Sequence, residues 1–123
     1  MAISTELSKL IDEIKSELPY AKGVVIASLD GVPILSSVIA SSATAEEIGA
    51  MGAMLYSVAR RSNESVGHGK FTEMLVRGED GVTAIYGAGA NAVLILALPP
   101  DANIGLANLV ARKTAEKVRQ LFE

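Results

Sequence analysis

Few residues in this chain have types suited to chemistry. Among its 123 residues His68 is the single histidine, and cysteine is absent. A cysteine nucleophile and a zinc site with cysteine ligands are therefore excluded, and no serine and aspartate have the spacing of a triad with His68. Glycines flank His68 on both sides, a setting typical of a loop. We expect His68 to be exposed and without catalytic function.

Two glycine-containing segments resemble nucleotide-binding loops without meeting their requirements. Gly69-Lys70 matches the end of a P-loop, but Glu64 stands where the first glycine should be. Phe71 also replaces the Ser or Thr that binds magnesium. Segment 87–91 lacks the third glycine of a dinucleotide fingerprint and joins two predicted strands. We predict turns at both places and no cofactor.

Adjacent carboxylates occur in three pairs, at 12–13, 46–47 and 79–80. These pairs fall on a helix face, at a helix start and in a turn, where solvation, the helix dipole and turn chemistry account for them. A calcium or magnesium site needs several converging oxygen ligands, and these pairs do not cluster along the chain. We therefore expect no metal, no catalytic residue and no enzymatic activity.

The charge balance argues against nucleic acid as a partner. The chain has 11 Lys and Arg against 14 Asp and Glu, a net charge of −3, whereas phosphate binding requires a basic face. The basic residues near the end are assigned to the last turns of a helix, where they complement its dipole. They are Arg112, Lys113, Lys117 and Arg119.

The N-terminal segment has no signal-peptide core, since Glu6 and Lys9 interrupt it. The longest charge-free run, 81–100, contains glycines and prolines and is interpreted as two buried strands. No membrane insertion and a cytoplasmic location are expected.

Hydrophobic periodicity predicts one domain spanning residues 1–123, with the order α-β-β-α-β-β-β-α. The fold class is α/β (α+β), a five-stranded antiparallel sheet with helices on both faces. Segment 92–98 is apolar throughout and is predicted as a central strand, whereas Pro33 places 32–37 at an edge. A capping box at Thr44 and Glu47 begins the second helix, which we expect to end near Arg61 or Ser62. Asp30-Gly31 is predicted as a two-residue hairpin turn.

The second helix is apolar on all sides between residues 45 and 59. One stripe, predicted to face the sheet, consists of Ile48, Met51, Leu55 and Val58. The other side carries small residues and a tyrosine, namely Gly49, Gly52, Ala53 and Tyr56. A helix that is apolar all round is buried on more than one side, and this chain offers little material for a third layer. We therefore predict that the second side contacts another copy.

The strand predicted at 71–77 is also apolar on both faces, and as an edge strand it would offer unpaired backbone groups to a second copy. Glu73 and Arg77 would supply polar partners across such an interface. The predicted dimer interface comprises Gly49, Gly52, Ala53, Tyr56, Phe71, Glu73, Leu75 and Arg77.

Taken in order, the motifs of the whole chain resemble the Roadblock/dynein light-chain family. The matching segments are Leu18-Pro19, 23–26, 30–33, 67–71, 91–98 and 100–106. The resemblance implies a profilin-like sandwich with strand order 2-1-5-4-3 and the second helix alone on one face. It also implies a homodimer joined through the third strand and the second helix.

The same resemblance implies a non-enzymatic regulator or scaffold for a small Ras-like GTPase, since the family includes bacterial MglB-type regulators. Some of these stimulate GTP hydrolysis. It suggests a GTPase-binding platform at Glu46, Glu47, Ala50, Arg60 and Arg61. The two arginines are assigned to the helix dipole rather than to an arginine finger. The alternatives are an assembly subunit that pairs with other Roadblock-type subunits, or a motor light chain; a small-molecule sensor is more remote.

Overall fold

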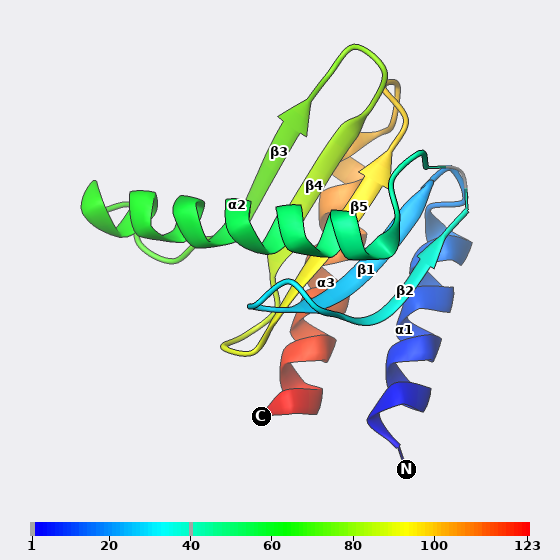
Figure 1. Cartoon of the computed structure of the whole chain (residues 1–123), viewed down its shortest axis with the longest axis horizontal. Coiled ribbons are helices and arrows are strands. Elements are labelled where there is room, and N and C mark those ends of the chain that lie inside the picture. Colours follow the sequence, from blue (N-terminus) through cyan, green and yellow to red (C-terminus); the bar gives the residue numbers. More distant parts are fainter. Residues whose placement is uncertain (1, 40) are drawn as a thin grey trace.

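A computed structural model describes residues 2–39 and 41–123 (Figure 1). Met1 and Ala40, which belong to the predicted domain 1–123, lie outside the described residues. The predicted order of elements is confirmed. The elements are α1 (Ile3–Glu17), β1 (Gly23–Ser28), β2 (Pro33–Val38), α2 (Ala45–Ser65), β3 (Glu73–Arg77), β4 (Val82–Gly87), β5 (Ala92–Leu98) and α3 (Ile104–Phe122).

The five strands form one antiparallel sheet in the order β2-β1-β5-β4-β3, as predicted. The apolar strand β5 lies at the centre, where six of its seven residues are buried. Pro33 opens β2 at one edge of the sheet, where its missing N–H leaves no ladder hydrogen bond unmade. The strand β3 forms the other edge.

Helices cover both faces of the sheet: α1 and α3 lie side by side on one face, and α2 crosses the other alone (Figure 1). Alternate residues of β1 supply the two cores, Val24 and Ile26 toward α1 and α3, and Val25 and Ala27 toward α2. The sandwich architecture is therefore built from two separate apolar layers. The α2 layer is the smaller, because a single helix provides it.

The turn between β1 and β2 has three residues, so the predicted two-residue turn is wrong. The N–H of Ser28 donates to the oxygen of Val32 at 2.9 Å, and the N–H of Gly31 donates to the oxygen of Ser28 at 2.9 Å. Within this loop only Gly31 has a positive φ, 88°. The loop is therefore a turn followed by a glycine in the left-handed conformation. Gly31 also lies against α2, where an added Cβ would stand 2.8 Å from the Cα of Ala50.

The predicted capping box at the start of α2 is present. The N–H of Glu47 donates to the hydroxyl oxygen of Thr44 at 3.1 Å, and the Glu47 carboxylate accepts from the N–H of Thr44 at 3.1 Å. The helix continues to Ser65, past its predicted end at Arg61 or Ser62. It ends only before Gly67, which has a φ of 72°.

Candidate functional site

The two sides of α2 are the reverse of those predicted. The residues that face the sheet and are buried are Ile48, Gly49, Gly52, Ala53 and Tyr56. Of the stripe predicted to face the sheet, Ile48 is buried there and Leu55 packs half-buried against the same core, whereas Met51 and Val58 are exposed. The predicted interface residues Gly49, Gly52, Ala53 and Tyr56 are therefore covered by the chain's own sheet.

Close approach of the helix to the sheet explains this reversal. An added Cβ at Gly52 would stand 2.2 Å from Cδ1 of Ile95, and one at Gly49 would stand 2.9 Å from the oxygen of Gly31. The small residues let the backbone of α2 lie directly on β1 and β5. Small residues at this spacing predict a contact with a helix of another copy, but they serve a close contact between a helix and a sheet equally well.

The outward side of α2, called here the outer face, has no covering element in the described chain. Its members are exposed and recur at helical spacing: Glu47, Ala50, Met51, Met54, Val58 and Arg61. Met54 is 63% exposed and Val58 54% exposed. Contiguous exposed apolar side chains rimmed by charge mark interaction surfaces. The expectation that one side of α2 lacks a partner within the chain is met, although with different residues.

The helix α2 also extends beyond the sheet. Along it, Gly49 lies against the β1–β2 turn, Gly52 against Ile95 of β5, and Tyr56 against Gly87 of β4. The helix α2 thus reaches a further strand every three to four residues as it crosses the sheet. Its last residues, 57–65, therefore extend towards β3 and past the edge of the sheet. Figure 1 shows this C-terminal part of α2 projecting beyond β3. In the described chain no strand lies under its end.

The edge strand β3 is short and largely exposed. Met74 packs against the core beneath α2 and is half-buried, whereas Leu75 is 37% exposed and Val76 is exposed. Its outer edge presents backbone donors and acceptors that no strand of the chain pairs. An exposed apolar edge strand beside an exposed apolar helix face forms a continuous candidate interface.

Glu73, predicted to lie in the dimer interface, has a partner within the chain. Its carboxylate accepts from Nε of Arg112 at 2.7 Å and forms an ion pair with the same guanidinium. The assignment of Arg112 to the dipole of α3 is therefore wrong, because its guanidinium instead links α3 to β3. Beside this ion pair the Tyr86 hydroxyl donates to Oδ1 of Asn108 at 2.6 Å, and burial raises the pKa of Tyr86.

Carboxylates also pair with two more of the basic residues on α3. Lys117 pairs with Glu13 of α1 at 3.3 Å, and Arg119 binds Glu116 and Glu123. These hydrogen bonds raise the pKa of Arg119 and lower that of Glu116. Carboxylates of the chain thus neutralise most of this basic cluster.

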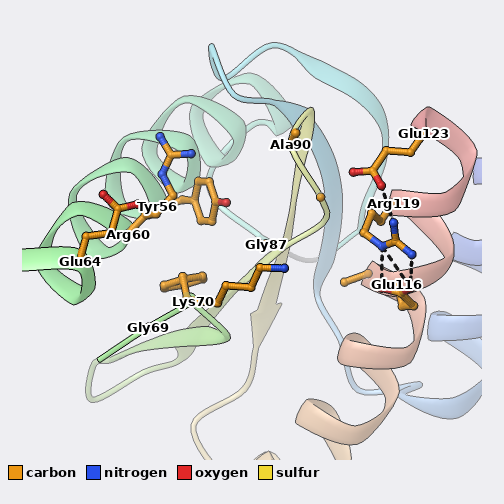
Figure 2. Close-up of a pocket in the computed structure, with 13 residues that line it drawn as sticks. Tyr56, Arg60, Glu64, Gly69, Lys70, Gly87, Ala90, Glu116, Arg119 and Glu123 are labelled. Atoms are coloured by element: carbon orange, nitrogen blue, oxygen red, sulfur yellow. Dashed lines mark hydrogen bonds and ion pairs between the residues drawn. The ribbon is translucent and has the colours of Figure 1, made fainter. Parts of the chain in front are cut away.

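A cleft of about 610 Å³ opens between the C-terminal half of α2, the loop before β3 and the end of α3 (Figure 2). On its α2 side the rings of Tyr56 and Phe71 meet edge to face with centroids 5.1 Å apart. The guanidinium of Arg60 lies 5.7 Å from the centroid of Tyr56. The amino group of Lys70 points into the cleft (Figure 2).

Three of the five predicted platform residues, Glu47, Ala50 and Arg61, lie on the outer face. Glu46 and Glu47 lie at the start of α2, and Ala50 and Arg61 are exposed further along. Arg60 is exposed too but turns toward the cleft, above Tyr56. The Glu47 carboxylate accepts hydrogen bonds from the N–H and the hydroxyl of Thr44. These bonds lower the pKa of Glu47, and the backbone bond has the larger effect.

Replacing Thr44 with alanine is expected to lower the free energy of unfolding by about 1 kcal/mol at pH 7, or about 4 °C in Tm. The lowered pKa of Glu47 means that its contribution is complete above its ordinary value of 4.5 and is lost as the pH falls through the lowered value. The difference between the wild type and the variant should therefore shrink below pH 4.5, as measured by urea titrations. Thr44→Ser is the matched control and should retain most of the stability; an equal loss there would contradict the capping role.

Residues 2–39 and 41–123 contain no group of three metal-ligating side chains. Within the same ranges, no helix combines the length and apolar character that crossing a membrane requires. His68 is exposed in the loop after α2, as predicted.

Comparisons with known proteins agree with this geometry. The Roadblock/LC7 domain model matches residues 7–97. Three uncharacterized proteins of Methanocaldococcus jannaschii are similar over nearly the whole chain. One of them, MJ1340, is 28% identical over 92% of this chain and 100% of its own length.

Solved structures share the fold. Myxococcus xanthus MglB superposes with a TM-score of 0.86 at 16% identity, covering 98% of each chain. A Roadblock/LC7 domain from Streptomyces avermitilis has a TM-score of 0.83 at 18% identity, covering 93% of this chain and 95% of its own. Acanthamoeba castellanii profilin II has a TM-score of 0.59 at 17% identity, covering 89% and 96%. The predicted profilin-like fold is confirmed.

Proposed function

This chain belongs to the Roadblock/LC7 family, and from that premise we propose that it is a non-enzymatic homodimer that regulates or scaffolds a small Ras-like GTPase. The observation that carries the proposal is the uncovered outer face of α2 beside the edge strand β3. Both are apolar enough to need a partner, and a family of regulators and light chains uses such surfaces for protein binding. In this proposal the homodimer and the GTPase are both cytoplasmic.

The two exposed elements suit a second copy of the chain. The end of α2 projects beyond β3 (Figure 1), and the outer edge of β3 is open to receive another strand. A two-fold arrangement would place each overhanging helix end above the β3 of the other copy. The half-buried Met74 and the exposed Val76 would then be covered.

The GTPase would bind the side of the dimer on which both α2 helices lie. Of the two arginines, Arg60 already stacks on Tyr56, so Arg61, which is exposed on the outer face, is the one a GTPase would meet. Glu47 and Ala50 lie on the same face. Stimulation of hydrolysis would come from reshaping the switch loops of the GTPase.

Pull-down experiments with Ras-like GTPases of the same organism, loaded with GDP or a GTP analogue, test this function. We expect binding in at least one nucleotide state and at least about 30-fold weaker binding for Arg61→Glu, the loss typical of an interface hot spot. Lys113→Glu, an exposed charge reversal on α3 at the opposite face of the sheet, is the matched control and should bind normally. Absence of binding in both nucleotide states would overturn the proposal. The rate of phosphate release during GTP hydrolysis then distinguishes a protein that stimulates the GTPase from one that only scaffolds it.

The second candidate is an assembly subunit that pairs with a different Roadblock-type chain. The presence of three similar proteins in one archaeon favours it, because a cell with several such chains can form mixed dimers. Co-purification of two differently tagged family members from one organism would reveal them. Accelerated GTP hydrolysis by the purified homodimer would count against this candidate. A small-molecule sensor remains a prediction that no observation here favours.

A further inference from the structure

The chain carries its sulfur only as methionine. It contains four methionines and no cysteine, so peroxide meets no thiol that would compete for it. Three of the methionines lie in the described part of the chain, namely Met51, Met54 and Met74. Met51 is 41% exposed and Met54 63% exposed, both on the outer face of α2. Peroxide in solution therefore reaches these two thioethers directly, since sulfur oxidation follows exposure.

The third of these methionines is better protected. Met74 lies opposite Ile85 on β3 and packs half-buried against the cluster beneath α2 that contains Tyr56. Because a half-buried thioether offers less of its surface to solvent, we expect oxidation to begin on the outer face. One chain thus holds a readily oxidised pair and a slowly oxidised internal reference.

Met51 and Met54 are neighbours on the helix. Residues three apart on an α-helix lie on one face, and in the described chain no element covers that face of α2 (Figure 1). The apolar members of the outer face are Ala50, Met51, Met54 and Val58. Methionine therefore supplies its two long, flexible apolar side chains. A partner that binds this face through apolar contact packs on thioethers.

We propose that Met51 and Met54 form an oxidation-sensitive switch: peroxide converts their thioethers to sulfoxides, and the sulfoxides release the bound GTPase. This inference rests on the proposed function and adds a regulation of the same face. At each methionine the sulfur gains one oxygen atom from the peroxide and loses two electrons to it, and the peroxide leaves as water. Sulfoxide reductases, one for each epimer, reverse the step with two thiols as the reductant, and the oxygen leaves as water.

Oxidation at these positions changes the outer face without reaching the core. The oxygen of a sulfoxide is hydrated while the face is open to water, and an apolar partner that covers it removes that water at a cost in free energy. The fold should survive, because Met51 and Met54 are exposed in the folded chain. A sulfoxide at Met74 would instead stand against the buried cluster and weaken the fold. The switch therefore acts on binding rather than on folding.

Peroxide treatment of the isolated protein tests the switch. The protein is oxidised alone with hydrogen peroxide, catalase removes the peroxide, and peptide mass spectrometry scores each methionine. We expect sulfoxides at Met51 and Met54 before Met74. A GTPase that binds the untreated protein should then bind at least about tenfold more weakly, because polar groups are buried without partners. The midpoint of urea unfolding should not change, and the two sulfoxide reductases should restore binding.

Variants are judged by the ratio of their affinities before and after peroxide, so that the basal affinity of each variant does not enter. Met51→Leu combined with Met54→Leu should give a ratio of about one, because leucine has no sulfur to oxidise. Met74→Leu is the matched control and should lose as much affinity on oxidation as the wild type.

Several results would overturn the switch alone: earlier oxidation of Met74, unchanged affinity after oxidation of the pair, an equal loss in the double variant, a lowered urea midpoint, or no recovery with the reductases. Absence of GTPase binding before peroxide would overturn the proposed function, and the switch with it. The pull-down with untreated protein thus separates the two failures.

Discussion

Replacing Ala53 with arginine is expected to unfold the protein, whereas the same replacement one residue later, at Met54, is expected to leave the fold intact. Ala53 is 4% exposed and packs against the sheet, while Met54 is 63% exposed. An unpaired buried charge and the overpacking of a filled layer together cost roughly 5 kcal/mol or more. That is comparable with the whole stability of a domain, about 5–15 kcal/mol. At Met54 the guanidinium remains in water and costs little.

Far-UV circular dichroism and urea titration of the two variants check this expectation. The Ala53 variant should lack a cooperative transition, and the Met54 variant should unfold within about 0.5 kcal/mol of the wild type, the range of ordinary surface changes. Measurement below the dissociation constant of the dimer separates folding from assembly. A folded Ala53 variant of wild-type stability would show that the two sides of α2 are not as described.

The second large effect is expected at the free edge of the sheet. Leu75→Asp should weaken the homodimer at least about 30-fold, the effect of losing a hot spot of 2 kcal/mol or more. An ionised aspartate would stand in place of an apolar side chain in the proposed interface, at the edge of the sheet that a second copy would cover. The monomer should stay folded, since Leu75 is already 37% exposed.

Leu109→Asp is the matched control, because Leu109 is a more exposed leucine, 69% exposed, and belongs to α3 rather than to the edge strand. Light scattering across a concentration series should find that variant as dimeric as the wild type. If Leu109→Asp dissociates the dimer while Leu75→Asp does not, the interface lies on the α1 and α3 side and the proposed one is wrong.

Local patterns along the sequence were enough to predict most of the architecture. The capping box at Thr44, the apolar run of β5 and the proline at the start of β2 each act through the backbone of their own element. Such effects do not depend on distant residues, so the elements and their central or edge positions were predicted correctly. The length of the turn at Gly31 was not predicted correctly, because the pairing of β2 with β1 sets the number of residues in this loop.

The candidate site was predicted less well, and the reason is geometric. Small residues at 49, 52 and 53 indicate close backbone approach, but spacing does not say whether a helix or a sheet approaches. Only the packing of Gly52 on Ile95 decides that a sheet does. Met51 is predicted to face the sheet from its place in the apolar stripe, whereas the structure leaves it exposed on the outer face.

The sequence by itself determined that this chain has few residues suited to chemistry, that its elements follow the order of a Roadblock-type domain, and that one helix and one edge strand lack partners. Those are properties of residue type and periodicity. The tertiary structure alone decided which side of α2 is free and that Arg112 of α3 binds Glu73 of β3. These depend on distances between segments far apart in the chain, which only folding brings together.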